Sequence, residues 1–217
     1  MQEFITVTGM VLKDEPIGEY DRRVVILTTD MGKISCFAKG ARKVNSRLMA
    51  ATNPFCFGEF KLYAGRNSYS LNDAHIQNYF ESLRTDYEGA LYGMYFLEVA
   101  DYYTRENNDD KEMLKLLYQS VRALENGKIP NPLVRYIFEI KSVVINGEYP
   151  GIPDKNVRVY DESTVYAVDH IVSSGVEKLY TFTVSESVLS ELKSIASYLM
   201  GHFTDRKFKS TEILNEM

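Results

Sequence analysis

Four cationic side chains within nine residues are the strongest chemical signal in this sequence, because clustered cations neutralise phosphate. Residues 39–47 contain four basic residues and no acid, and Gly40 and the Asn45-Ser46 pair favour a loop. The four cations are Lys39, Arg42, Lys43 and Arg47. Ammonium and guanidinium groups bind phosphate oxygens, so we expect a DNA-binding loop here. The alternative interpretation is an ordinary solvated basic loop.

Aromatic side chains near this loop offer a second kind of contact, the stacking of unpaired bases. Alternation along residues 33–39 places Phe37 on the outward face of the expected strand, so Phe37 joins the candidate DNA-binding residues. Arg66 joins them as well, because it lies in a second basic turn that Tyr63 and Tyr69 flank.

Arg22 and Arg23 complete the candidate DNA-binding set. They open an expected strand directly after Glu19 and Asp21. Ion pairing with these two acids explains the arginines as well as phosphate contact does, and the sequence leaves both interpretations open.

Catalytic or metal-binding chemistry finds little support. His75, His170 and His202 lie far apart, and none has a partner at the spacing of a metal site. Cys36 and Cys56 fit as small core residues. The sequence contains neither a GxxxxGK[ST] phosphate loop nor a GxSxG nucleophile motif. We therefore expect a protein that is not an enzyme and has no catalytic residue, metal or cofactor.

Charge is distributed unevenly along the chain. The net charge is −5, yet residues 1–79 hold ten basic and eight acidic residues, whereas residues 80–217 hold fifteen basic and twenty-two acidic ones. Local fields matter more than the total for the attraction of a polyanion. The basic excess in the first 79 residues is therefore compatible with a nucleic-acid partner.

The elements that position these residues are expected to be strands. Short alternating or β-branched runs, separated by turn signals, predict five of them, with a turn at residues 14–20. The runs are Phe4–Lys13, Arg23–Thr28, Lys33–Lys39, Phe55–Ala64 and Tyr69–Gln77. Five short strands in so few residues favour a small closed barrel, so we expect an OB-fold DNA-binding domain over residues 1–79.

The hydrophobic period then becomes that of helices, which predicts a mainly α-helical domain over residues 80–217 and an α+β fold class. Helices are expected over 79–105, around 113–124, from an N-cap at Asn131, and from an N-cap at Ser185 to an end or bend at Gly201. Residues 150–184 are expected to form an irregular or β insert. Its three strand-like runs are Val157–Tyr160, Val165–Val168 and Leu179–Val184.

The cellular setting follows from what the sequence lacks. No apolar run approaches the roughly 20 residues of a membrane helix, and the first residues do not have the order of a secretion signal. We expect a cytoplasmic protein with neither a membrane partner nor a small-molecule substrate.

Several motifs resemble, in order, those of the RecO family of recombination mediators. GEYDRRVVILT at residues 18–28 resembles the family's GExDRxVxLxT stretch, and KGARK at 39–43 with SRL at 46–48 resembles its (K/R)GARK…SRL segment. Further matching segments are Gly9–Leu12, Gly32–Ser35, Pro54–Phe55, Leu62–Arg66, Ala90–Asp101, Arg135–Pro150 and Lys209–Ser210. The resemblance covers most of the chain.

The resemblance implies a function in DNA recombination and the repair of DNA damage. RecO proteins bind single- and double-stranded DNA, anneal complementary strands and partner with RecR. They help load RecA onto strands coated by single-strand-binding protein, and some bind that protein's acidic tail. Many also carry a four-cysteine zinc site after the helix that ends here at Gly147. Residues 150–184 contain no cysteine, so we expect a helical domain lacking the zinc site.

Three hypotheses therefore stand. The first is a DNA-binding mediator, and the second is a protein-interaction scaffold of the same family with negligible DNA binding of its own. The third is an unrelated small enzyme with the barrel as an accessory, which a pocket holding several titratable groups would favour.

Overall fold

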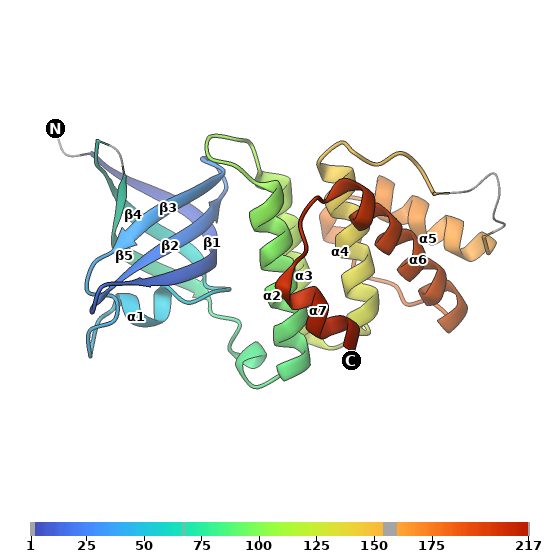
Figure 1. Cartoon of the computed structure of the whole chain (residues 1–217), viewed down its shortest axis with the longest axis horizontal. Coiled ribbons are helices and arrows are strands. Elements are labelled where there is room, and N and C mark those ends of the chain that lie inside the picture. The colour runs from blue at the N-terminus through green and yellow to red at the C-terminus, as the bar shows by residue number, and fades with distance from the viewer. Residues whose placement is uncertain (1–2, 67, 154–159, 217) are drawn as a thin grey trace. The chain divides into compact units, whose positions relative to one another are not determined.

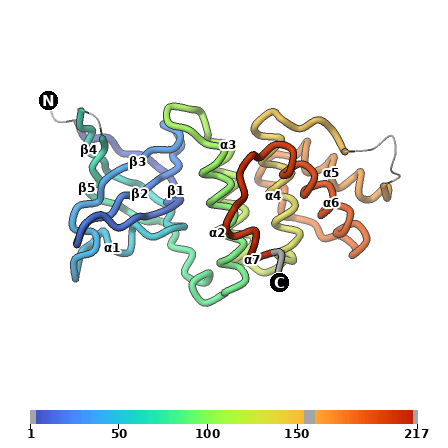
Figure 2. Tube along the Cα trace, viewed as in Figure 1, coloured from blue at the N-terminus to red at the C-terminus, as the bar shows by residue number. Residues whose placement is uncertain are grey.

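The computed structural model describes residues 3–66, 68–153 and 160–216, and the chain divides into two compact units. The first unit comprises Met1–Arg84 with Leu97–Leu114, and the second comprises Thr85–Phe96 with Lys115–Met217. Figure 1 labels the helices and strands of both units, and Figure 2 follows the chain through them.

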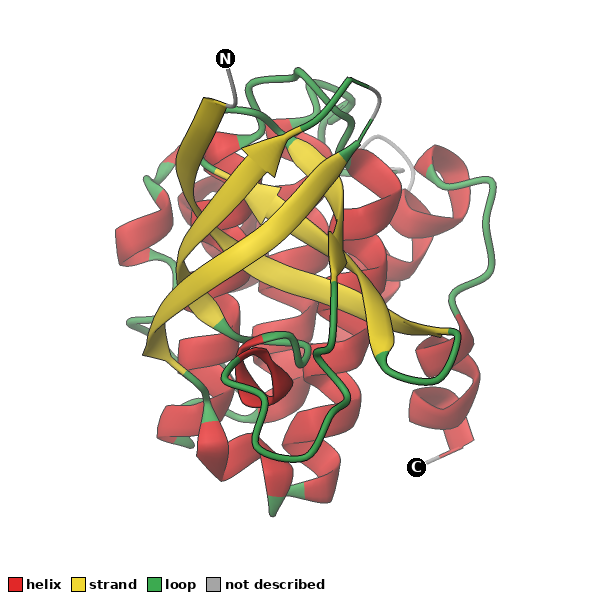
Figure 3. Ribbon diagram, turned by 90° about the vertical axis from the view of Figure 1, so that its left-hand side faces the viewer, coloured by secondary structure: helices red, strands yellow, loops and turns green. Residues whose placement is uncertain are grey.

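A closed five-stranded barrel forms the first unit's sheet, as the sequence predicts (Figure 3). Its strands are β1 (Glu3–Ile17), β2 (Asp21–Thr28), β3 (Lys33–Ala38), β4 (Phe57–Ala64) and β5 (Tyr69–Asn78). They follow the order β1-β2-β3-β5-β4, and every pair is antiparallel except β3 with β5. The predicted OB-type barrel followed by helices is confirmed.

Alternation of side chains explains the barrel. Along β3, Ile34, Cys36 and Ala38 are buried, whereas Phe37 between them is exposed. The inward residues of the other strands join the same core, to which the buried Ala41 of the basic loop also belongs.

The first strand is longer than the sequence predicts. β1 continues through Pro16 to Ile17, so the turn that was expected over residues 14–20 is reduced to Gly18, Glu19 and Tyr20. Pro16 is accommodated because it lies in the second-last registered pair of the β1–β2 hairpin, opposite Arg22.

Lys33 fastens the turn between β2 and β3 to the helical segment of the same unit. Its ammonium donates to the backbone carbonyl and, at 2.8 Å, to the carboxylate of Asp101. Gly32 has a φ of +62°, and an added Cβ would collide with the carbonyl oxygen of Arg105. Glycine therefore permits this close approach.

Helices and the loops between them make up the rest of the described chain. They are α1 (Leu48–Ala51), α2 (Tyr87–Tyr103), α3 (Lys111–Asn126), α4 (Asn131–Ile145), α5 (Glu162–Ser173), α6 (Glu186–Phe203) and α7 (Lys209–Glu216), with 3-10 turns at Glu81–Arg84 and Val176–Lys178. None of the helices within the described ranges is long and apolar enough to cross a membrane.

Helix boundaries differ from the sequence predictions at several places. The helix expected over 79–105 begins only at Tyr87, after the separate 3-10 turn at Glu81–Arg84. Pro130, not Asn131, occupies the N-cap of α4, and the Asn131 side-chain amide instead donates to Glu88 at 3.2 Å. Ser185 caps α6 as predicted, accepting from the Val188 amide, but α6 continues past Gly201 to Phe203. The short α1 was not predicted.

The predicted small sheet in residues 150–184 is wrong where the structure describes it. Val165–Val168 lies inside α5, whose N-cap Asp161 accepts from the Ser163 amide at 2.7 Å. Leu179–Val184 is a loop after a 3-10 turn. Of the third run, Val157–Tyr160, only Tyr160 lies within the described residues, and it is not in a strand.

Candidate nucleic-acid interface

The basic loop is ordered by its own backbone. Successive turns are closed by hydrogen bonds from the Lys43 amide to Gly40, from Ser46 to Lys43 and from Met49 to Ser46, each 3.1 Å long. Two further bonds tie the loop to the β1–β2 turn. The Arg42 amide donates to Tyr20 at 2.9 Å, and the Gly40 amide donates to the Asp21 carboxylate at 2.7 Å.

All four cations of this loop are exposed. None of them forms an ion pair with a carboxylate that the structure describes. Arg42 donates to the carbonyl of Gly18 at 3.1 Å, and the Lys43 ammonium lies 5.5 Å from the centre of the Tyr20 ring. No Asp or Glu occurs in the sequence from Met31 to Gly58. The four cations therefore form no ion pair with a described carboxylate, although the Asp21 carboxylate adjoins the start of the loop through its bond to the Gly40 amide.

A lateral row of paired residues crosses the outer face of the barrel beside this loop. Strand register pairs Arg23 with Phe37, Phe37 with Ser70, Ser70 with Tyr63, and Tyr63 with Phe4. Directly paired residues point to the same side of a sheet, so this row shares one face. Phe37 is 37% exposed and Phe4 is 50% exposed, which leaves two aromatic rings open to a ligand.

Phe4 and Lys61 are candidate site residues that the sequence reasoning missed. The Phe4 ring meets Tyr63 edge-on at 5.8 Å, and the Lys61 ammonium lies 5.1 Å from the centre of the Phe4 ring. Outward alternation in β1 and β4 was a usable signal for each residue separately. Their proximity depends on the pairing of β1 with β4, which joins residues far apart in sequence.

Arg22 is half-buried and held by several partners. Its guanidinium donates to Thr52 at 2.9 Å, to Asn53 at 2.8 Å and to the Met49 carbonyl. It also pairs with Asp14 at 3.3 Å, and not with the Glu19 or Asp21 that the sequence suggested. Contact between Arg22 and DNA stays a prediction, and its observed contacts position α1 against β1 and β2.

Arg23 and Arg66 are both exposed, but they are placed differently. Arg23 lies in the lateral row and donates to Ser35 at 2.8 Å. Arg66 lies in the β4–β5 turn, which a bond of 3.0 Å from the Gly65 amide to Ser68 closes. Neither residue is in the basic loop, so the predicted set is distributed over a loop, a face and a turn.

The predicted core cysteines are buried in the barrel. Burial raises the pKa of the Cys36 thiol to about 12 and that of Cys56 to about 11. Within the described residues, no three His, Cys, Asp or Glu side chains are grouped as metal ligands.

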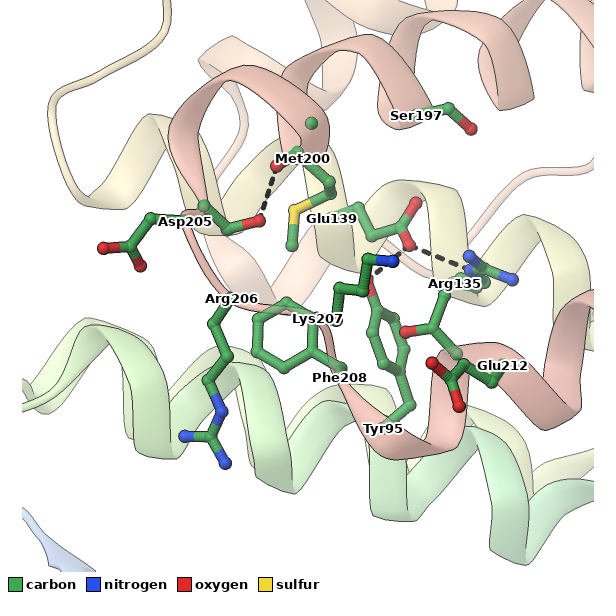
Figure 4. Close-up of a pocket in the computed structure, with 13 residues that line it drawn as sticks. Tyr95, Arg135, Glu139, Ser197, Met200, Asp205, Arg206, Lys207, Phe208 and Glu212 are labelled. Carbon is green, nitrogen blue, oxygen red and sulfur yellow. Dashed lines mark hydrogen bonds and ion pairs between the residues drawn. The ribbon is translucent and has the colours of Figure 1, made fainter.

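A second candidate site is a pocket of about 600 Å³ in the helical unit (Figure 4). Tyr95 of α2, Met200 of α6 and Phe208 supply apolar surface, and Arg206 and Lys207 line the pocket from the segment before α7. Its other lining residues are Arg135, Glu139, Ser197, Gly201, Thr204, Asp205, Thr211 and Glu212.

The pocket contains several titratable groups, but its buried carboxylate is already engaged. Glu139 accepts hydrogen bonds from the Tyr95 hydroxyl at 2.6 Å and from Arg135 at 2.8 Å. The charge of Arg135 compensates the buried Glu139, and Phe208 packs edge-on against Tyr95 at 5.7 Å. This arrangement resembles a charged binding pocket more closely than an acid–base pair awaiting a substrate.

Comparisons with known proteins find similarity to one and the same family over nearly the whole chain. A family model described as recombination protein O N terminal matches residues 1–80, and one described as recombination protein O C terminal matches residues 84–153. A "DNA repair protein RecO" of Acetivibrio thermocellus is 26% identical, with 99% of this chain and 97% of the relative covered. The protein of that name from Clostridium novyi is 26% identical over 95% and 92%. One from Caldicellulosiruptor bescii is 33% identical over 67% of this chain and 59% of the relative.

Proposed function

Because the chain belongs to the RecO family of DNA repair proteins, we propose that it is a non-enzymatic DNA-binding recombination mediator. In this role it binds single- and double-stranded DNA, anneals complementary strands and, with RecR, helps load recombinase onto strands coated by single-strand-binding protein. None of these tasks requires a nucleophile or a metal. They require charge neutralisation, which lets two polyanions approach, and contacts that tolerate any sequence.

The basic loop, whose four cations form no ion pair with a described carboxylate, is the observation that carries this proposal. Four exposed cations in one ordered loop attract phosphates even though the whole chain has a net charge of −5. The aromatic rings of Phe37 and Phe4 lie on the adjoining face, where unpaired bases can stack. Phosphate and base contacts are thus available on one barrel.

Binding of a fluorescent single-stranded oligonucleotide across a range of salt concentrations tests the proposal. Four phosphate contacts predict a slope of about −2.8 in a plot of log affinity against log salt. Replacing Lys39, Arg42, Lys43 and Arg47 together by alanine is expected to flatten this slope and weaken binding. An unchanged slope and affinity would show that this loop is not the site. Negligible binding by the wild-type chain would instead favour the scaffold hypothesis.

We further propose that the pocket of the helical unit binds the acidic tail of single-strand-binding protein. Arg206 and Lys207 can pair with carboxylates of the tail, while Tyr95, Met200 and Phe208 can receive an apolar side chain. Three acids, Glu139, Asp205 and Glu212, line the pocket beside three bases, so recognition of the tail must come from local pairing and not from a net positive charge of the pocket. A labelled tail peptide should bind the wild type and lose affinity when Arg206 and Lys207 are both replaced by alanine. Equal affinity for both proteins would rule out this pocket.

A further inference from the structure

Exposed apolar side chains gather at the same end of the barrel as the basic loop. Of eleven large hydrophobic residues that are exposed in the described chain, four belong to the β1–β2 hairpin end, the basic loop and α1. They are Ile17, Tyr20, Val44 and Met49, at 38%, 46%, 85% and 38% exposure. A single exposed apolar residue needs no explanation, but this group coincides with the strongest cluster of cations.

Val44 is the extreme member of this group. At 85% exposure it is the most exposed of these large hydrophobic residues, and it lies between Lys43 and the positive-φ residue Asn45. The turn from Lys43 to Ser46 holds its backbone, and its β-branched side chain has few rotamers. The loop therefore presents a short, stiff apolar side chain with cations before and after it in sequence.

An aliphatic tip and an aromatic face suit different forms of DNA. Unpaired bases stack on flat rings such as Phe37, and valine offers no such plane. Apolar side chains, branched aliphatic ones among them, can act instead as wedges that enter a stacked base step from the minor groove and kink the duplex. The minor groove has a phosphate backbone on each side, and Arg42, Lys43 and Arg47 are exposed cations close to Val44 in the sequence of the loop.

We propose that Val44 is a wedge that the basic loop inserts into the minor groove of double-stranded DNA, while the cations around it hold the flanking phosphates. This inference rests on the proposed DNA-binding function and assigns paired DNA to the loop and unpaired bases to the outer face. The two contacts are then separable by substitution.

The test is to remove the Val44 contact with the duplex and the Phe37 contact with unpaired bases independently of one another. Val44→Ser removes the apolar tip of an exposed residue, and Val44→Leu retains it. Phe37→Ala removes a stacking ring, and Tyr166→Ser changes a residue of comparable exposure, 75%, in the other unit. Each variant and the wild type are titrated, at one salt concentration, with a 30-mer duplex labelled at both ends and with the single strand of the same sequence. Energy transfer between the two ends reports bending.

Val44→Ser is expected to weaken duplex binding about tenfold, the loss for one buried valine side chain, with single-strand affinity unchanged. It should also abolish the wild-type bend, which we expect to lie between about 20° and 90°. Val44→Leu and Tyr166→Ser should bind and bend DNA as the wild type does, and Phe37→Ala should weaken only the binding of the single strand.

Two results would overturn the wedge and spare the proposed function. In the first, Val44→Ser leaves the affinity for the duplex unchanged, which would assign the apolar patch to a protein partner. In the second, Val44→Ser weakens the binding of duplex and single strand equally. Failure of the wild type to bind either form would refute the proposed function itself.

Discussion

At the scale of single residues, adjacent arginines have different roles. The Arg22 guanidinium is engaged by Thr52, Asn53, Met49 and Asp14, whereas Arg23 is exposed. We expect Arg22→Ala to lower the free energy of unfolding by about 2 kcal/mol, because it leaves several polar partners without their donor. Urea unfolding measures the loss, and Arg23→Ala, which should cost under about 0.5 kcal/mol, is the matched control. Similar losses in both variants would contradict this assignment.

The cysteines predict how stability depends on pH. Burial raises the folded-state pKa of Cys36 from its usual 9.0 to about 12, so the folded protein keeps a proton that the unfolded chain releases. The stability that this proton contributes is complete below pH 9 and is lost as pH rises from 9 towards 12. Cys36→Ala should make the fall in melting temperature across this range shallower. In native protein at pH 8, neither thiol should react with a thiol reagent.

At the scale of elements, Lys141 of α4 holds the end of α5. It is only 7% exposed, and its ammonium donates to the carbonyls of Ile171, Val172 and Ser174 at 3.1, 2.9 and 2.8 Å. Lys141→Met should cost about 2 kcal/mol, because these carbonyls lose a charged donor at a helix C-terminus. Hydrogen exchange should accelerate most in α5, and Lys193→Met on the exposed face of α6 should leave it unchanged.

The sequence predicted strands and helices well where a single spacing of hydrophobic residues extends over the whole segment. In β3 the alternation of Ile34, Cys36 and Ala38 determined both the strand and the outward position of Phe37. In α5 the short run Val165–Val168 suggested a strand, yet buried Thr164, Val168 and Ile171 follow a helical period. Four residues are too few to distinguish the two periods. The contacts of Arg22 and Phe4 were beyond prediction because they depend on non-local pairing.

At the scale of the whole molecule, local charge and net charge make opposite predictions about DNA. Removing the loop cations changes the net charge from −5 to −9. Replacing four exposed lysines of the helical unit by alanine changes it equally, and these are Lys128, Lys178, Lys193 and Lys209. We expect the loop variant to lose salt-dependent oligonucleotide binding and the helical-unit variant to retain it within about twofold, because salt screens distant charges. Equal losses would mean that overall charge, and not the loop, controls binding.

The barrel closes along a short seam. Two registered pairs, Cys36 with Tyr69 and Phe37 with Ser70, join β3 to β5 within the described residues. Phe37 itself belongs to one of these pairs. If a nucleotide strand stacks on Phe37 as proposed, it would contact both sides of this seam, and DNA binding and barrel closure would then favour each other.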